Sequence, residues 1–116
     1  MKSFCYACKG IATALHSEMN MRIHIVAAIL VVTAGFFFEL SSIEWGVVII
    51  CIVLVISFEL INTAIEELCN LVQPEHHPIV KKIKDIAAAA VLIAAVGSLV
   101  IAFIIFLPKL ISLIGI

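Results

Sequence analysis

The chain has 116 residues, of which 65% are hydrophobic and only 13% are charged, and its formal net charge is −1. A soluble domain carries roughly 25% charged residues, so the composition excludes an ordinary soluble domain and indicates an integral membrane protein with a single domain, residues 1–116. Without an excess of positive charge, nucleic acid is not an expected partner.

Residues 3–21 carry apolar side chains at helical spacing with polar and charged ones between them. This pattern predicts an amphipathic helix in the membrane surface. Within it, Cys5 and Cys8 have the spacing of half a zinc or redox site, but no second pair follows. We therefore expect reduced cysteines and no structural metal.

A first transmembrane span is predicted over residues 22–38. The long side chain of Arg22 can reach back so that its charged group lies at the membrane interface. The connection 39–44 carries two glutamates and no basic residue, and Trp45 after it is typical of an interfacial anchor. A second span is predicted over residues 45–72. Because it exceeds the ~20 residues that cross a bilayer, its last turns are expected to protrude.

The segment 73–78 is expected to break the helix, since Pro74 and Pro78 lack backbone donors and restrict the residues before them. A third span is predicted over residues 85–107, ended by Pro108. The expected fold is therefore all-α, with one surface helix and three transmembrane helices.

The basic residues are divided unequally between the two sides of this topology. One side receives Lys2, Lys9, Arg22, Lys81, Lys82 and Lys84, and the other only Lys109. By the positive-inside rule, the N-terminus and the 73–84 loop are expected to be cytoplasmic.

Three polar side chains lie on one stripe of the second span. If the helix is continuous, Glu59, Asn62 and Glu66 fall within an arc of roughly 60°. A charged group in the hydrocarbon layer costs at least ~2.5 kcal/mol, which suggests a functional site. In a single chain the stripe would face lipid on some side, so we expect oligomerisation to bury it.

The residue types at the cytoplasmic end are suited to binding a polyphosphate. Glu18 and Glu66 offer the carboxylate oxygens that Mg²⁺ prefers, and Mg²⁺ usually shares them with substrate phosphates. Lys84, expected beside the N-terminal end of the third span, adds a cation where free backbone N–H groups could also bind phosphate. Glu59 lies seven residues deeper and could accept a proton from a lipid hydroxyl.

Simpler interpretations remain open for several of these residues. Arg22 could be only an interfacial anchor, and Glu18 part of a solvated face. His76 and His77 could be solvated loop residues, and Asp85 could cap the third helix. The stripe itself could serve only hydrogen bonding between helices.

Several segments resemble a known family. The residues 59–66 (ELINTAIE), 74–78 (PEHHP) and 84–91 (KDIAAAAV) resemble the prokaryotic diacylglycerol kinase family, and Lys9-Gly10 followed by Ser17-Glu18 is similar to its N-terminal part. The resemblance implies a homotrimeric three-span lipid kinase in the cytoplasmic membrane of a prokaryote. Such an enzyme transfers the γ-phosphoryl group of ATP to a lipid hydroxyl with Mg²⁺ as cofactor.

The resemblance also implies roles for individual residues. The catalytic positions would be Glu59, Asn62 and Lys84, and the metal ligands Glu18 and Glu66. The nucleotide-contacting set would be Tyr6, Glu18, Glu66, Glu75, His76, His77, Lys84 and Asp85. The lipid substrate would contact Glu59 and Ala88.

The family divides into diacylglycerol kinases and undecaprenol kinases. Residues 19–24, 44–45 and 106–109 look more like the undecaprenol kinases, which favours undecaprenol slightly as the substrate. Two rival interpretations are a small oligomeric ion or proton-coupled transporter and a non-catalytic scaffold. A transporter would be expected to carry an ionisable residue near the membrane centre, whereas these acidic residues lie toward one end of the span.

Overall fold

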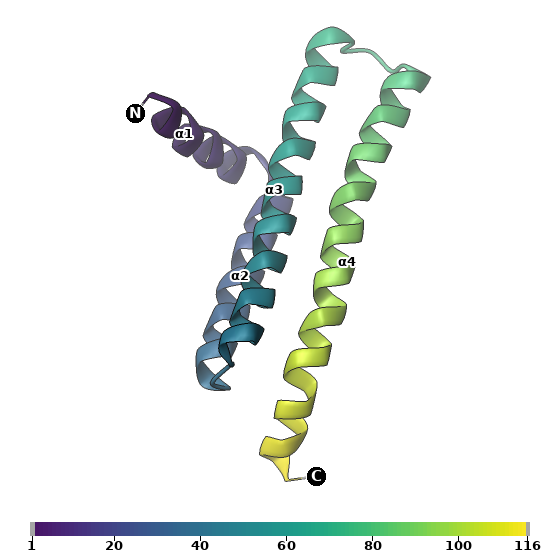
Figure 1. Cartoon of the computed structure of the whole chain (residues 1–116). Coiled ribbons are helices and arrows are strands. Elements are labelled where there is room, and N and C mark those ends of the chain that lie inside the picture. Colours follow the sequence, from purple (N-terminus) through teal and green to yellow (C-terminus); the bar gives the residue numbers. More distant parts are fainter. Residues whose placement is uncertain (1, 116) are drawn as a thin grey trace.

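The computed structural model describes residues 2–115 and, within them, consists of four α-helices. These are α1 (Lys2–Ser17), α2 (Met19–Phe37), α3 (Ser42–Val72) and α4 (Pro78–Ile114). The helices α2, α3 and α4 run lengthwise, with α3 in contact with both of the others, and α1 projects from the bundle at an angle (Figure 1). The all-α prediction is confirmed.

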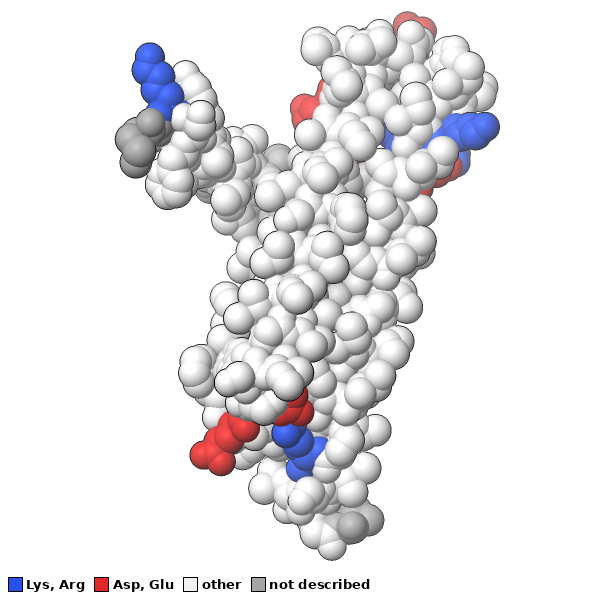
Figure 2. All heavy atoms as spheres, viewed as in Figure 1, with Lys and Arg blue, Asp and Glu red and all other residues white. Residues whose placement is uncertain are grey.

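The three long helices α2, α3 and α4 are long and apolar enough to cross a membrane. The charged side chains gather toward the two ends of the molecule and leave a wide uncharged band between them (Figure 2). Only 6% of the most apolar stretch of α4 is buried in the chain. A surface of this kind requires lipid or another protein around it, so the protein is a multi-pass membrane protein.

The first helix ends at Ser17, four residues earlier than predicted, and α2 begins correspondingly early. The break lies at Glu18, whose backbone is extended (φ −119°, ψ 117°). Its N–H still donates to the carbonyl of Ala14 at 2.9 Å, and Arg22 Nη2 donates to the carbonyl of His16 at 3.4 Å. Both bonds satisfy carbonyls that the end of a helix leaves free. Arg22 therefore does more than anchor the interface, because it links α1 to α2.

A capping box begins α3 before the predicted residue 45. Ser41 Oγ accepts from the Glu44 N–H at 3.2 Å, and the Ser41 N–H donates to Glu44 Oε1 at 2.9 Å. Trp45, expected to be an interfacial anchor, packs its ring against Phe36 with the ring centroids 4.9 Å apart. The ring also covers Gly35, where a Cβ would lie 2.6 Å from Trp45 Cη2. Glycine is thus required for this close contact.

The helix α4 extends beyond the predicted third span, residues 85–107, at both ends. The helix α4 starts at Pro78, where proline fits the first helical position, and His77 Nδ1 caps it by accepting from the Ile79 N–H at 3.1 Å. Asp85 therefore lies inside the helix and is not its cap. Pro108 does not end the helix, since proline removes only one donor and transmembrane helices tolerate this.

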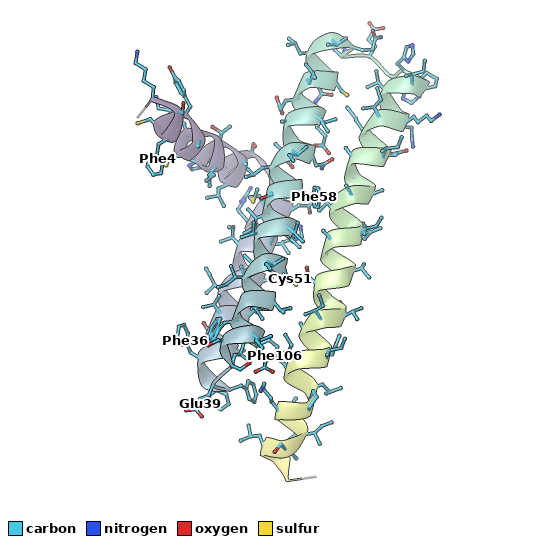
Figure 3. All side chains as sticks on the ribbon, viewed as in Figure 1. Phe4, Phe36, Glu39, Cys51, Phe58 and Phe106 are labelled. Carbon is cyan, nitrogen blue, oxygen red and sulfur yellow. The ribbon has the colours of Figure 1, made fainter. Side chains whose placement is uncertain are left out.

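The end of the bundle opposite the α3–α4 loop is held by side chains of three helices. Lys109 Nζ lies 3.2 Å from Glu44 Oε1, which joins α4 to the start of α3. Phe38 and Phe106 bring their rings to 5.9 Å. Figure 3 shows Phe36, Glu39 and Phe106 at this end. These contacts set how the helices are aligned along their axes. That alignment determines which polar residues lie next to one another at the other end of the bundle.

Candidate active site

The helices differ in length, and this places the polar residues at one end of the bundle. At 1.5 Å per residue, α3 is about 46 Å long and α2 about 28 Å. The helix α2 ends and α3 begins at the 38–41 connection. Because α3 is longer, its last turns and the first turns of α4 extend beyond the start of α2. A bilayer core of ~30 Å is shorter than α3, so its last turns are still expected to protrude from the membrane.

Glu59 is the most deeply buried charged residue, with 2% of its surface exposed. Its Oε2 lies 3.5 Å from Nε2 of His24 on α2, and its backbone carbonyl accepts from the Thr63 hydroxyl at 3.0 Å. Asn62 is also buried. The expectation that oligomerisation is needed to bury this stripe is therefore wrong for Glu59 and Asn62, because both are already buried in a single chain.

Glu66 lies about 10 Å along the helix axis from Glu59, seven residues at 1.5 Å each, and is only half-buried. Asn62 Nδ2 donates to Glu66 Oε1 at 3.3 Å. Glu18, at the α1–α2 break, is also half-buried, and both it and Glu66 act electrostatically on Glu59. Three carboxylates thus form one cluster (Glu18, Glu59 and Glu66) whose members differ in exposure.

Asn62 has one further feature that points toward a ligand. Its Oδ1 is buried and has no hydrogen-bond partner among residues 2–115. Such groups are rarely left unpaired in a folded protein. An oxygen acceptor with a free lone pair therefore lies beside Glu66, on the same stripe of α3.

Lys84 lies on the facing helix but not where it was expected. It is six residues after the start of α4, so it is not beside the free N–H groups of the first turn. Its Nζ donates to Asn70 Oδ1 on α3 at 2.7 Å. Asp85 points elsewhere and pairs with Lys81 at 2.6 Å on an exposed face. The cation is thus held at the end of α3, on the side of Glu66 away from Glu59.

The remaining predicted residues are exposed, and within residues 2–115 they make no hydrogen bond or ion pair with the carboxylate cluster. Tyr6 lies on α1 and is 67% exposed. Glu75 and His76 lie in the α3–α4 loop, and Ala88 lies on α4 one turn after Lys84. Their roles remain predictions.

Two residues of this region were missed in the sequence. His24 was treated only as part of a lineage motif, although a histidine one turn or so inside an apolar span is itself costly and needs a partner. Asn70 continues the stripe of Asn62 and Glu66 at a spacing of four residues, which is the signal that would have found it.

A divalent cation would have to be shared with a substrate. Within residues 2–115, no three His, Cys, Asp or Glu side chains are placed to hold a metal ion. Glu18, Glu66 and Asn62 Oδ1 nevertheless offer hard oxygen atoms, the donor type that suits Mg²⁺ when phosphates complete its coordination. Cys5 and Cys8 are free and exposed on α1.

An apolar cavity of about 170 Å³ lies between α2, α3 and α4. His24, Cys51 and Phe106 are among the residues that line it. Figure 3 shows Phe106 toward the end of the bundle opposite the α3–α4 loop and Cys51 nearer the middle. Small side chains such as Ala28 and Ala95 form much of its wall. The cavity thus extends from the His24–Glu59 pair toward the far side of the membrane span, through surroundings suited to hydrocarbon.

Comparison with known proteins agrees with the residue pattern. A family model described as prokaryotic diacylglycerol kinase matches residues 5–106. The chain is 46% identical over 109 residues to an undecaprenol kinase of Bacillus subtilis (strain 168), which covers 94% of this chain and 89% of the relative. It is 38% identical over 112 residues to a diacylglycerol kinase of Synechocystis sp., covering 96% of this chain and 64% of that longer relative.

A diacylglycerol kinase of Escherichia coli (strain K12) is 30% identical over 100 residues, which is 86% of this chain and 82% of the relative. All three relatives are named as kinases, one for undecaprenol and two for diacylglycerol. With the family model covering most of the chain, the protein belongs to the prokaryotic diacylglycerol kinase family.

Proposed function

We propose that this membrane kinase transfers the γ-phosphoryl group of ATP, with Mg²⁺, to the hydroxyl of a membrane lipid alcohol at the cytoplasmic interface. The acceptor is undecaprenol or diacylglycerol, with undecaprenol slightly favoured because the undecaprenol kinase of Bacillus subtilis is 46% identical to this chain. The product is a lipid phosphate for phospholipid or cell-envelope lipid metabolism.

The observation that carries this proposal is the graded burial of the carboxylate cluster. Glu66 and Glu18 are half-buried toward the polar end of the bundle, whereas Glu59 is 2% exposed and about 10 Å deeper. A polyphosphate is confined to water, and a lipid hydroxyl is confined to the membrane surface. A reaction between the two needs acidic groups on both sides of that boundary, and one stripe of α3 supplies them.

Each residue then has a separate task in an in-line transfer. Glu18 and Glu66 would hold the Mg²⁺, which neutralises phosphate charge when bound. Lys84 would stabilise charge on the phosphates. Glu59 would accept the proton as the lipid oxygen bonds to the γ-phosphorus and ADP leaves. Most of the rate enhancement would come from positioning and electrostatic stabilisation, as in phosphoryl transfer generally.

The acceptor would approach from the membrane side. The apolar cavity borders His24 and therefore reaches the level of Glu59. A lipid alcohol with its chain among α2, α3 and α4 would present its hydroxyl at that level. This geometry supports a lipid acceptor.

The assembly and orientation also belong to the proposal. The N-terminus and the α3–α4 loop would face the cytoplasm, and α1 would lie in the surface of the cytoplasmic membrane as an amphipathic helix. Its exposed Phe4 and Tyr6 support that placement. The broad exposed apolar faces of α4 support association with further copies, and the resemblance makes the expected assembly a homotrimer.

The test is transfer of labelled phosphate. Purified protein in mixed micelles is incubated with γ-labelled ATP and either undecaprenol or diacylglycerol, with Mg²⁺ or with a chelator. We expect a labelled lipid monophosphate that requires Mg²⁺, formed at least as fast from undecaprenol. No label in either lipid with Mg²⁺ present would refute the proposed function.

A further inference from the structure

The side chain of His24 lies beside the proposed base but takes no part in the proposed phosphoryl transfer. It is 20% exposed, and its Nε2 lies 3.5 Å from Oε2 of Glu59, a side chain that is 3% exposed. The other charged groups that act on Glu59 are the carboxylates of Glu18 and Glu66. His24 is thus the one group acting on Glu59 that can bear a positive charge or donate a hydrogen bond to it, among the residues described.

We propose that His24 is a positioning residue for Glu59, holding Oε2 through its Nε2–H so that the other carboxylate oxygen is free to accept the proton of the lipid hydroxyl. This inference rests on the proposed function, because it assigns a partner to the proposed base. It concerns the orientation and the ionised state of Glu59, and no contact of His24 with ATP.

Burial explains why such a partner is needed. A carboxylate in an apolar setting must be paired or hydrogen-bonded to remain charged. The nearby hydroxyl of Thr63 does not serve, because it donates to the backbone carbonyl of Glu59 and not to the carboxylate. Asn62 donates its amide to Glu66. The imidazole is left as the donor within reach of the Glu59 side chain.

The location of His24 also fits a role in this reaction. Its side chain lines the apolar cavity as well as facing Glu59. The imidazole therefore stands between the proposed hydrocarbon path and the proposed base. A lipid hydroxyl arriving from the cavity would meet the carboxylate beside this histidine.

Two substitutions of equal length separate positioning from packing. His24→Gln keeps a side-chain N–H donor, whereas His24→Met fills similar space without one. A hydrogen bond to a charged group is lost only in the second, so we expect kcat to fall about 10- to 100-fold for His24→Met and less than about threefold for His24→Gln. The KM for ATP is expected to stay within about twofold, since the pair lies away from the nucleotide end.

A double variant tests whether His24 acts through Glu59. In a Glu59→Gln background, His24→Met is expected to change the residual kcat less than about threefold, because the base that His24 would position is already absent. His16→Gln, at an exposed histidine on α1, is the matched control and is expected to leave kcat unchanged. The melting temperature is recorded for every variant.

Several outcomes would overturn the inference. These are an unchanged kcat in His24→Met, an equal loss in His24→Gln, the same loss in the Glu59→Gln background, or a loss that follows a fall in melting temperature. Failure of the proposed function looks different, because the wild type itself would then transfer no phosphate to either lipid.

Discussion

Replacing Glu59 with glutamine removes the proposed base while leaving its surroundings almost unchanged. The substitution keeps the shape of the side chain, and the hydrogen bond from the Thr63 hydroxyl survives because it goes to the backbone carbonyl. His24 can still donate to the amide oxygen. We therefore expect a folded protein with a melting temperature close to that of the wild type.

The effect on turnover follows from the position of Glu59. Loss of a general base lowers rates by about 10²- to 10⁴-fold, which is about 3 to 5 kcal/mol of activation free energy. Glu66 lies about 10 Å away along α3, beyond direct contact with Glu59. The KM for ATP is therefore expected to change less than about twofold, with the loss confined to kcat.

The assay is steady-state transfer of labelled phosphate at saturating lipid, with ATP varied. Glu67→Gln is the matched control, because it removes an exposed carboxylate next to Glu66 that has no assigned role. A Glu59→Gln protein with normal kcat, or with a KM for ATP raised tenfold at unchanged kcat, would refute the assignment of Glu59 as the base.

Three further predictions follow from the same geometry. Glu66→Gln is expected to lower kcat/KM for Mg–ATP by at least about 100-fold with an unchanged melting temperature. The substitution removes a proposed metal ligand but keeps the shape of the side chain. Near-normal activity at low Mg²⁺ would contradict this. Gly35→Ala is expected to destabilise the protein by about 1–3 kcal/mol, because its Cβ would lie 2.6 Å from the ring of Trp45, and a detergent melting curve like the wild type's would contradict the close contact. Gly97→Ala has no atom within 4 Å of its Cβ, so we expect it to leave the melting curve unchanged as the control for Gly35→Ala.

The order of the helices could be predicted from the sequence, whereas their ends could not. This sequence has three apolar runs separated by polar connections, and each run is long enough to span a membrane. The ends depend on local contacts: the Ser41–Glu44 capping box extends α3 backwards, and His77 caps α4 well before its apolar run begins. Proline at 108 was treated as a terminator, which is a rule for helices in water and not for helices supported in a membrane bundle.

The site residues on α3 were predictable because their spacing alone places them on one stripe. The neighbours of that stripe were not, since a single sequence does not reveal which face of α3 is covered by α2. The structure places Glu59 beside His24 of α2 and buries both Glu59 and Asn62 within one chain. The partnership of Glu59 with His24 and that of Lys84 with Asn70 are consequences of this packing.

The most direct test of the account is equilibrium binding of a non-hydrolysable ATP analogue with Mg²⁺ to the wild type, Glu59→Gln and Glu66→Gln. In the proposed mechanism, Glu66 serves the nucleotide and Glu59 serves the lipid. The mechanism predicts that the Kd rises at least about tenfold in Glu66→Gln and stays at the wild-type value in Glu59→Gln. Equal weakening in both variants, or weakening in Glu59→Gln alone, would contradict the division of the cluster along α3.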